Sequence, residues 1–392
     1  MLCVSLAAIS QNNTNSPFSR YGYGEMNDNV PGAYRALGGV GIGMRESRVI
    51  NSAQPASYTV VDSTTFMFDL AASVMWNTYK DAAGVRNRAN GNLEYITMQF
   101  PIWKQHIGMS LGVMPYSMVG YNFAATDSIN SDYHYIMSYD GTGGITEVYG
   151  GLSFNVLNWF AVGANIYYMF GRINNSSSIT FTEGLRSVTE INRLHVNDVR
   201  FRVGAQFFHD FEKHAFSVGA VFENRSALNG DMTLLEVSST DTISSTYLPS
   251  DFPMVWGVGA MYKWAGRVML SADYMRYCWA SAAYYDKSLR LQDRQKISFG
   301  AEYVHNPLGR RYIDHMPWRL GFSISDPYVT SVAGKEFTVS IGTAFPLHNV
   351  ATVLNTTLEY GRRGSNNMLM ENYLRLTVNV SVSENWFFKR RL

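Results

Sequence analysis

The fold of this chain is decided by ten residues near its C-terminus, Tyr373-Leu-Arg-Leu-Thr-Val-Asn-Val-Ser-Val382. From Leu374 onward every second residue is aliphatic, whereas the residues between are Tyr, Arg, Thr, Asn and Ser. A two-residue repeat is that of a β-strand, whose successive side chains point to opposite faces. One wholly aliphatic face opposite a polar face indicates that the two sides of this strand meet different surroundings.

The same alternation recurs along the chain and predicts about fourteen strands. Their second face is rich in Gly, Ser and Asn, with isolated charges, where a water-facing sheet would carry more Lys and Glu. The expected spans are 63–77, 92–100, 106–124, 145–155, 158–170, 199–208, 213–224, 254–264, 267–279, 292–305, 316–324, 335–345, 350–360 and 371–383. We expect the last strand to pair with the first near Phe66–Val74.

The expected connections alternate between long and short, apart from 306–315, which is long where a short turn is due. Segments 78–91, 125–144, 171–198 and 225–253 are the long loops, and turns such as Ala265-Gly266 are the short ones. Outer-membrane barrels of bacteria have short periplasmic turns and longer external loops. An even number of strands then places both termini in the periplasm.

Composition supports a membrane barrel. Charged residues are 16 % of the 392 residues, below the usual quarter, and aromatic residues are 14 %. No stretch approaches the 18 or so continuous apolar residues of a membrane-spanning helix. A chain that crosses lipid without helices must close into a barrel, because lipid cannot satisfy an open sheet edge. The prediction is an all-β transmembrane antiparallel barrel at 63–392 in a Gram-negative outer membrane, with membrane lipid around it.

A large soluble β-sandwich or solenoid is the alternative, and alternation alone does not exclude it. No repeat of 20–50 residues is present, which disfavours solenoids and propellers. The net charge of +1 argues against nucleic acid as a partner.

The N-terminal residues lack the alternating pattern of the strands. Residues 1–10 are apolar and end in Ala8-Ile9-Ser10, which fits the cleavage site of a signal peptide. The basic residues that open such a peptide are missing, so an ordinary apolar N-terminus is the alternative. Residues 11–62 are rich in glycine and too short for an independent domain. We expect them inside the barrel as a plug, since a barrel of this size would otherwise hold an open lumen.

Three stretches carry a family resemblance: Ser16-Pro-Phe-Ser-Arg-Tyr-Gly22 with Gly38-Gly39, Asn51-Ser-Ala-Gln-Pro-Ala-Ser57, and Trp386-Phe-Phe-Lys-Arg-Arg391. With them the chain resembles the FadL-like (OmpP/TodX-type) outer-membrane transporters of long-chain fatty acids and other hydrophobic compounds, in their Bacteroidota branch. The resemblance implies a fourteen-stranded barrel with an N-terminal hatch. Gln54 departs from the family, whose motif has Asn before Pro55 and Ala56.

The resemblance also implies functional residues. Asn51, Gln54, Pro55 and Ala56 would form a hatch, which is either a gate that moves or a permanently closed plug. In the third strand, Pro115 lacks a ladder donor and is expected to kink the strand, with Gly112 and Gly120 beside it. FadL-like transporters are expected to open laterally to the bilayer at such a kink. The alternative is a simple bulge that sets the curvature of the barrel.

Isolated charges on the strands are expected to face the lumen, where they pair with one another, hold the plug or bind a carboxylate headgroup. They are Glu94, Arg202, Asp273, Arg276, Glu302, Arg319, Glu359 and Arg375. No catalytic or metal-binding motif stands out: no HExxH or Gly-x-Ser-x-Gly sequence is present. We therefore expect no enzyme, metal or cofactor.

Two functions follow. The first is an outer-membrane channel for diffusive uptake of hydrophobic small molecules such as long-chain fatty acids, by hatch movement and lateral opening. The alternative is a non-conducting accessory barrel, a subunit of an outer-membrane secretion or barrel-assembly complex.

Overall fold

The computed structural model describes residues 14–385, except 83, 131–132, 182–186, 239–241, 248–249, 287–288, 308, 348–351 and 366–368. The predicted signal segment 1–10 and the tail Trp386–Arg391 lie outside the described residues. Among those described, no helix is long and apolar enough to cross a membrane.

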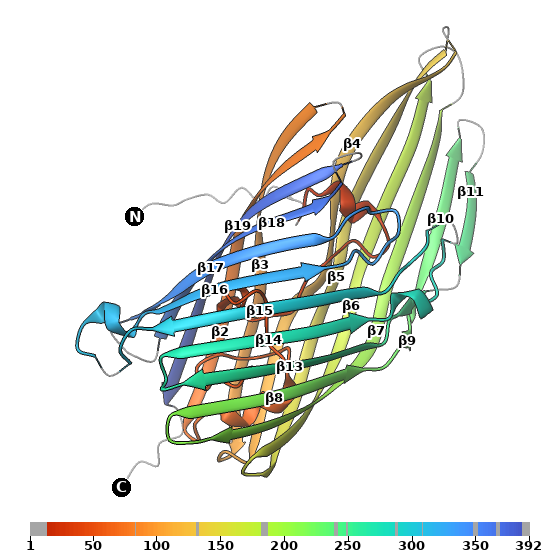
Figure 1. Cartoon of the computed structure of the whole chain (residues 1–392). Helices are drawn as coiled ribbons and strands as arrows, with labels where there is room; N and C mark the ends of the chain where they lie inside the picture. The colour runs from red at the N-terminus through yellow and green to blue at the C-terminus, as the bar shows by residue number, and fades with distance from the viewer. Residues whose placement is uncertain are drawn as a thin grey trace, which may run out of the picture.

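Fourteen of the described strands form a closed antiparallel barrel, as predicted (Figure 1). Its wall consists of β2 (Thr65–Asp81), β3 (Gly84–Trp103), β4 (Ile107–Asn130), β5 (Tyr133–Leu157), β6 (Phe160–Phe181), β7 (Val188–Asp210), β8 (His214–Glu223), β13 (Val255–Trp264), β14 (Val268–Tyr277), β15 (Arg294–Val304), β16 (Pro317–Ser325), β17 (Glu336–Pro346), β18 (Thr352–Gly364) and β19 (Met370–Asn385). The barrel closes where β19 pairs with β2, with Leu376 opposite Val74 and Val382 opposite Phe68. The predicted pairing of the last strand with the first is therefore confirmed.

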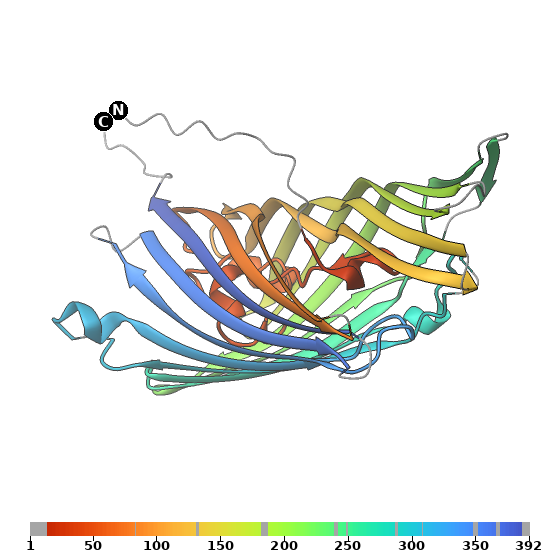
Figure 2. The ribbon, with the colours of Figure 1, turned by 90° about the horizontal axis from the view of Figure 1, so that it is seen from above.

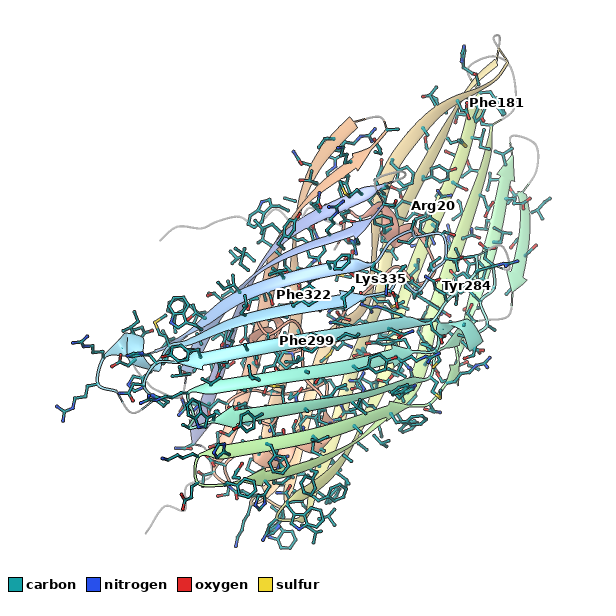
Figure 3. All side chains as sticks on the ribbon, in the orientation of Figure 1. Arg20, Phe181, Tyr284, Phe299, Phe322 and Lys335 are labelled. Carbon is teal, nitrogen blue, oxygen red and sulfur yellow. The ribbon has the colours of Figure 1, made fainter. Side chains whose placement is uncertain are left out.

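The outer face of the wall is apolar. On neighbouring strands, Phe299 of β15 and Phe322 of β16 are paired and exposed, and both lie on the outside of the near wall (Figure 3). Val378 and Leu376 of β19 are exposed on the same outer surface, whereas Thr377 and Asn379 are buried. The aliphatic face that the sequence analysis singled out is therefore the one that meets lipid.

Three predicted loops are wrong. Segments 78–91, 125–144 and 171–198 are largely strand, because β2 to β7 continue as long hairpins past the predicted ends. β4 alone has 24 residues, whereas about 9–11 tilted residues cross a bilayer. The outer halves therefore form a tall sheet beyond the barrel mouth (Figure 1), with Phe181 near its top (Figure 3). The predicted loop 225–253 also contains short strands.

The remaining elements belong to the plug and the loops. They are η1 (Pro17–Arg20), β1 (Glu25–Met26), α1 (Gly32–Arg35), η2 (Pro55–Val60), β9 (Ser226–Ala227), β10 (Gly230–Ser238), β11 (Thr242–Tyr247), β12 (Asp251–Phe252), η3 (Trp279–Ser281) and η4 (Tyr312–His315). β10 pairs with the outer half of β7 and with β11, which widens the tall sheet. The described part of the predicted plug, residues 14–62, lies within the barrel (Figure 2).

Candidate functional site

The wall has a seam between β3 and β4. These strands pair from Trp103 opposite Ile107 to Ile96 opposite Val113, and there the pairing ends. Beyond it, β3 continues with β2 alone, and β4 continues with β5. We call the separation between β3 residues 84–95 and β4 residues 114–130 the seam.

A bulge borders the seam on each side. Glu94 of β3 is an extra residue opposite Ala71 and Ala72 of β2. Tyr116 of β4 is an extra residue between Pro115 and Ser117 in the pairing with β5. A bulge bends its strand and increases the local twist, so the two bulges separate β3 from β4 at this level.

The residues predicted for a lateral opening lie on β4, along the seam and at its lower end. Pro115 is in the third wall strand, directly before the Tyr116 bulge. Gly112 lies at the end of the β3–β4 pairing, opposite Thr97. Gly120 lies beyond the bulge, in the seam. Gly112, Pro115 and Gly120 thus lie along one strand, β4, on both sides of the point where its pairing with β3 ends.

The plug takes the place of β3 along β4. The Asn27 backbone N–H donates to the Tyr116 carbonyl at 2.9 Å, and Asn27 Nδ2 donates to the Pro115 carbonyl at 3.2 Å. Strand β1 pairs next, with Met26 opposite Ser117 and Glu25 opposite Met118. Backbone groups left unpaired in lipid cost several kcal/mol each. The plug therefore serves as the missing neighbour of β4 from Pro115 to Gly120.

The predicted hatch motif anchors the plug on β7 and β8. Gln54 is fully buried, and its Nε2 lies 3.2–3.3 Å from the carbonyls of Ile42, Ala205 and Ala220. Its Oε1 accepts from the Ala56 N–H at 3.3 Å and caps η2, which begins at Pro55. A single amide thus joins two plug segments to β7 and β8.

Asn51 and Ala56 also hold the plug in place. Asn51 Nδ2 donates to the carbonyls of Gly41 and Met44, at 2.7 and 3.1 Å, and folds the plug on itself. The Ala56 carbonyl accepts from Ser153 Oγ of β5 at 3.0 Å. All four predicted hatch residues are therefore buried, and Gln54 and Ala56 bond the wall directly.

Ion pairs fix the plug to the far wall. Asp28 lies 2.6 Å from Lys296 Nζ and 3.3 Å from an Arg294 nitrogen. Burial alone would raise the pKa of the Asp28 carboxyl, but Lys296 and Arg294 hold this pKa well below its usual range. Asp28 therefore stays ionised throughout the physiological range.

Two further ion-pair groups join plug and wall. Arg35 of α1 pairs with Glu94, the bulge residue of β3, at 2.7 Å. Arg363 of β18 pairs with Glu25 of β1 at 2.9 Å and with Glu371 of β19 at 2.8 Å. Since Asp28, Arg35 and Glu25 each meet a wall charge of opposite sign, moving the plug would leave several buried charges without partners.

Sequence analysis identified the wall charges only in part. Arg202, Asp273, Glu302, Arg319, Glu359 and Arg375 have buried or nearly buried side chains on the inner face, as does Glu94. Arg276 was predicted wrongly, because it pairs with Asp293 near the outer rim and is 41 % exposed. The plug residues Glu25, Asp28 and Arg35 were missed, since no local pattern marks a charge whose partner lies far away along the chain.

An aromatic cluster covers the plug at the outer mouth. Tyr23 packs against Phe252, Trp279 and Tyr284 with ring centroids 5.3–5.5 Å apart. Tyr328 contacts Trp279, and its hydroxyl lies 2.8 and 2.7 Å from the carbonyls of Tyr21 and Gly24. These aromatic residues come from the external loops and the plug, so the loops close over the plug.

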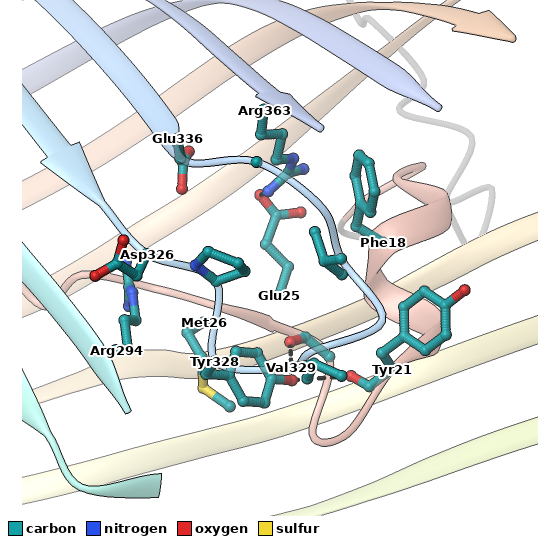
Figure 4. Close-up of a pocket in the computed structure, with 14 residues that line it drawn as sticks. Phe18, Tyr21, Glu25, Met26, Arg294, Asp326, Tyr328, Val329, Glu336 and Arg363 are labelled. Carbon is teal, nitrogen blue, oxygen red and sulfur yellow. Dashed lines mark hydrogen bonds and ion pairs between the residues drawn. The ribbon is translucent and has the colours of Figure 1, made fainter. Parts of the chain in front are cut away.

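Tyr328 also lines a small cavity of about 80 Å³ (Figure 4). Phe18, Tyr21, Met26 and Val329 give it an apolar wall, and the Glu25–Arg363 ion pair lies at its edge. A second cavity of about 60 Å³ is lined mainly by charged and polar residues.

The fold is shared with solved structures of outer-membrane channels. CymD, a monoaromatic hydrocarbon channel, has a TM-score of 0.61 at 12 % identity and covers 91 % of this chain and 98 % of its own. The toluene transporter TbuX of Ralstonia pickettii gives 0.60 at 13 % identity, over 89 % and 97 %. The toluene transporter TodX of Pseudomonas putida gives 0.60 at 14 % identity, over 93 % and 100 %. At these identities the likeness shows the fold alone.

The predicted FadL-like resemblance therefore holds for the architecture. No curated protein matches the chain. A family model described as BamG matches residues 1–392, the whole sequence, and the chain belongs to the BamG family.

Proposed function

We propose that this barrel does not conduct and that it acts as a structural subunit of an outer-membrane barrel-assembly complex. One observation carries the proposal: the plug is hydrogen-bonded into the wall as the neighbour of β4. A gate that moved would expose the β4 edge from Pro115 to Gly120 at the level where β3 and β4 part. It would also separate the ion pairs of Asp28, Arg35 and Glu25.

The character of the lumen supports a closed barrel. Its inner wall carries buried Arg, Lys, Glu and Asp residues that are paired with one another or with the plug. Such a lining would not stabilise a hydrophobic solute. The solute would separate these charges from their partners and offer them no hydrogen bond in return. The two cavities beside β1 of the plug, of about 80 and 60 Å³, are too small for a long-chain fatty acid.

The family supports the choice of complex. The family model that matches residues 1–392 is BamG and not a FadL-like transporter, which favours the subunit over the channel. The tall sheet of β4 to β7 and β10 to β11 supplies a surface beyond the membrane on which partners could assemble (Figure 1). The proposal makes this chain a binding protein rather than an enzyme.

A disulfide lock tests the proposal. A Cβ added at Gly342 of β17 would lie 2.6 Å from the Cβ of Ala36 at the end of α1. A shift of about 1 Å brings this pair to the separation of about 3.8 Å that a disulfide needs. Ala36→Cys with Gly342→Cys, in a Cys278→Ser background, should therefore lock the plug to the wall. We expect the locked protein to co-purify with a stoichiometric complex in mild detergent and to support growth like the reduced form.

A second candidate is the hydrophobic-compound channel, which the interrupted pairing next to Pro115 favours. In this case the plug would withdraw from β4 and a solute would leave through the seam into lipid. The same lock separates the two functions. Loss of toluene or fatty-acid uptake on oxidation, with recovery on reduction, would establish the channel and overturn the subunit proposal.

A further inference from the structure

The outer part of β4 is an open strand edge. Beyond the plug contact at Gly120, residues 121–128 pair with β5 on one side. On the other side, no strand in the described part of the chain pairs with them. Ala124, Ala125, Thr126, Asp127 and Ser128 are all exposed.

The direction of the free groups follows from Gly120. Its N–H and carbonyl both bond Ser19, on the side away from β5. Backbone groups alternate between the two sides of a strand with a period of two. The N–H and C=O groups of Asn122, Ala124 and Thr126 therefore point into the open side, and those of Tyr121, Phe123 and Ala125 bond β5.

This edge lacks the devices that normally protect an edge strand. Such strands carry Lys, Pro or inward-pointing charges, or are covered by a loop. Residues 121–128 read Tyr-Asn-Phe-Ala-Ala-Thr-Asp-Ser and hold one charge, Asp127, and no proline. An unprotected edge of this length outside the membrane is a template for a further strand.

The chain itself already adds a strand to this edge. A few residues below, β1 of the plug pairs antiparallel with Ser117 and Met118 of β4. The open edge continues directly from that pairing. A partner segment would extend an existing interface, with main-chain bonds supplying the affinity.

A second copy of the barrel is a poor occupant. In one bilayer both copies run β4 away from the membrane, so an antiparallel β4–β4 pair cannot form. A two-fold axis along the membrane normal also makes two tilted strands cross rather than align. The occupant is therefore an extended segment of a different chain.

We propose that residues 121–128 of β4 form a strand-addition site for an extended segment of a partner protein at the cell surface. This inference rests on the proposed subunit function and names the surface through which the complex is held. Small residues at Ala124 and Ala125 leave room for the side chains of the added strand.

Residue-resolved amide hydrogen exchange tests the proposal on the full chain, both free in detergent and in the isolated complex. In the free barrel the N–H groups of Asn122, Ala124 and Thr126 should exchange fast and those of Phe123 and Ala125 slowly. In the complex, exchange at the N–H groups of Asn122, Ala124 and Thr126 should slow at least about tenfold, which corresponds to about 1.4 kcal/mol. Packing without strand addition would not produce this alternation.

Proline variants supply the second arm. Ala124→Pro with Thr126→Pro removes two outward donors and keeps the β5 ladder, whereas Ala124→Ser with Thr126→Ser is the matched control. We expect the proline pair to release the partner and the serine pair to retain it. Ala124→Lys provides a variant without backbone change and should also weaken the complex.

The outcomes separate this inference from the proposed function. A complex that persists in the proline and lysine variants, with unchanged exchange at Asn122 and Ala124, overturns the strand-addition site alone. If the wild-type barrel is isolated without any stoichiometric partner, the subunit function fails and this inference fails with it.

Discussion

Ser19 of the plug and Gly120 of the wall are hydrogen-bonded in both directions. The Gly120 N–H donates to Ser19 Oγ at 3.1 Å, and the Ser19 hydroxyl is shared between the Ser16 carbonyl, at 2.6 Å, and the Gly120 carbonyl, at 3.3 Å. One side chain thereby replaces a residue of the strand that β4 lacks at this position. The plug is thus part of the wall as well as a filling of the lumen.

Ser19→Ala should loosen the plug at the seam. The Gly120 N–H and carbonyl would lose their partner while buried, which costs about 1–3 kcal/mol. The expected result is a lower midpoint of heat-induced mobility change in detergent gels. Ser63→Ala, at an exposed position before β2, is the control and should leave the midpoint unchanged. Equal midpoints for both variants would show that Ser19 does not hold the seam.

Asp28→Asn should destabilise the plug more. It leaves Lys296 and Arg294, both less than 10 % exposed, without their carboxylate. We expect a loss of about 2–3 kcal/mol, less than for a fully buried pair because the Asp28 side chain is 29 % exposed. Unfolding in denaturant measures this loss, and adding Lys296→Met should restore part of it.

The same ion pair predicts a pH dependence. Because the pKa of Asp28 is lowered in the folded state, its contribution is complete above the unfolded value of about 3.9 and is lost as pH falls through the folded pKa. The wild-type protein should therefore keep this stabilisation over roughly pH 5 to 8 and lose it only in strong acid. The difference between wild type and Asp28→Asn should shrink there. A difference that stays constant into acid would mean that the carboxylate charge is not the cause.

Gly204→Ala should interfere with plug docking. A Cβ at Gly204 would overlap Gln54 Oε1 and lie 2.9 Å from Pro55 Cδ. Overpacking of this kind costs about 1–3 kcal/mol. Gly91→Ala is the matched control, since its Cβ would meet only the Ser73 carbonyl, at 3.7 Å. Protease access to the plug in purified barrels should rise for Gly204→Ala alone.

The barrel wall could be predicted from sequence because one face of each strand is in lipid. The alternation from Leu374 to Val382 predicted the strand and its lipid-facing side, and closure of the predicted barrel then predicted its pairing with β2. The hairpin extensions could not be predicted in the same way. Around Asn174–Ser178 of β6 both faces are polar and meet water, so strand pairing leaves no hydrophobic pattern.

For the hatch, the sequence predicted which residues belong to it but not which wall and plug groups they contact. Gln54 was noted as a departure from the Asn of the family motif. The structure shows that its amide reaches carbonyls on Ile42, Ala205 and Ala220. Contacts such as Asp28 with Lys296 join residues that only the closed barrel brings together, and a single sequence carries no local signal for them.

Tyr328→Phe should open the outer cover of the plug. The hydroxyl of Tyr328 bonds the carbonyls of Tyr21 and Gly24, and the ring packs on Trp279 at 5.1 Å between centroids. Because the ring remains, the variant removes the hydrogen bonds alone, at a cost of about 1 kcal/mol. The loop at 326–335 should then be cleaved faster by protease added to whole cells. Tyr312→Phe, on an exposed turn at the opposite end of the barrel, should not change the rate. If both variants are cleaved like wild type, the loop is held by ring packing rather than by its hydrogen bonds to the plug.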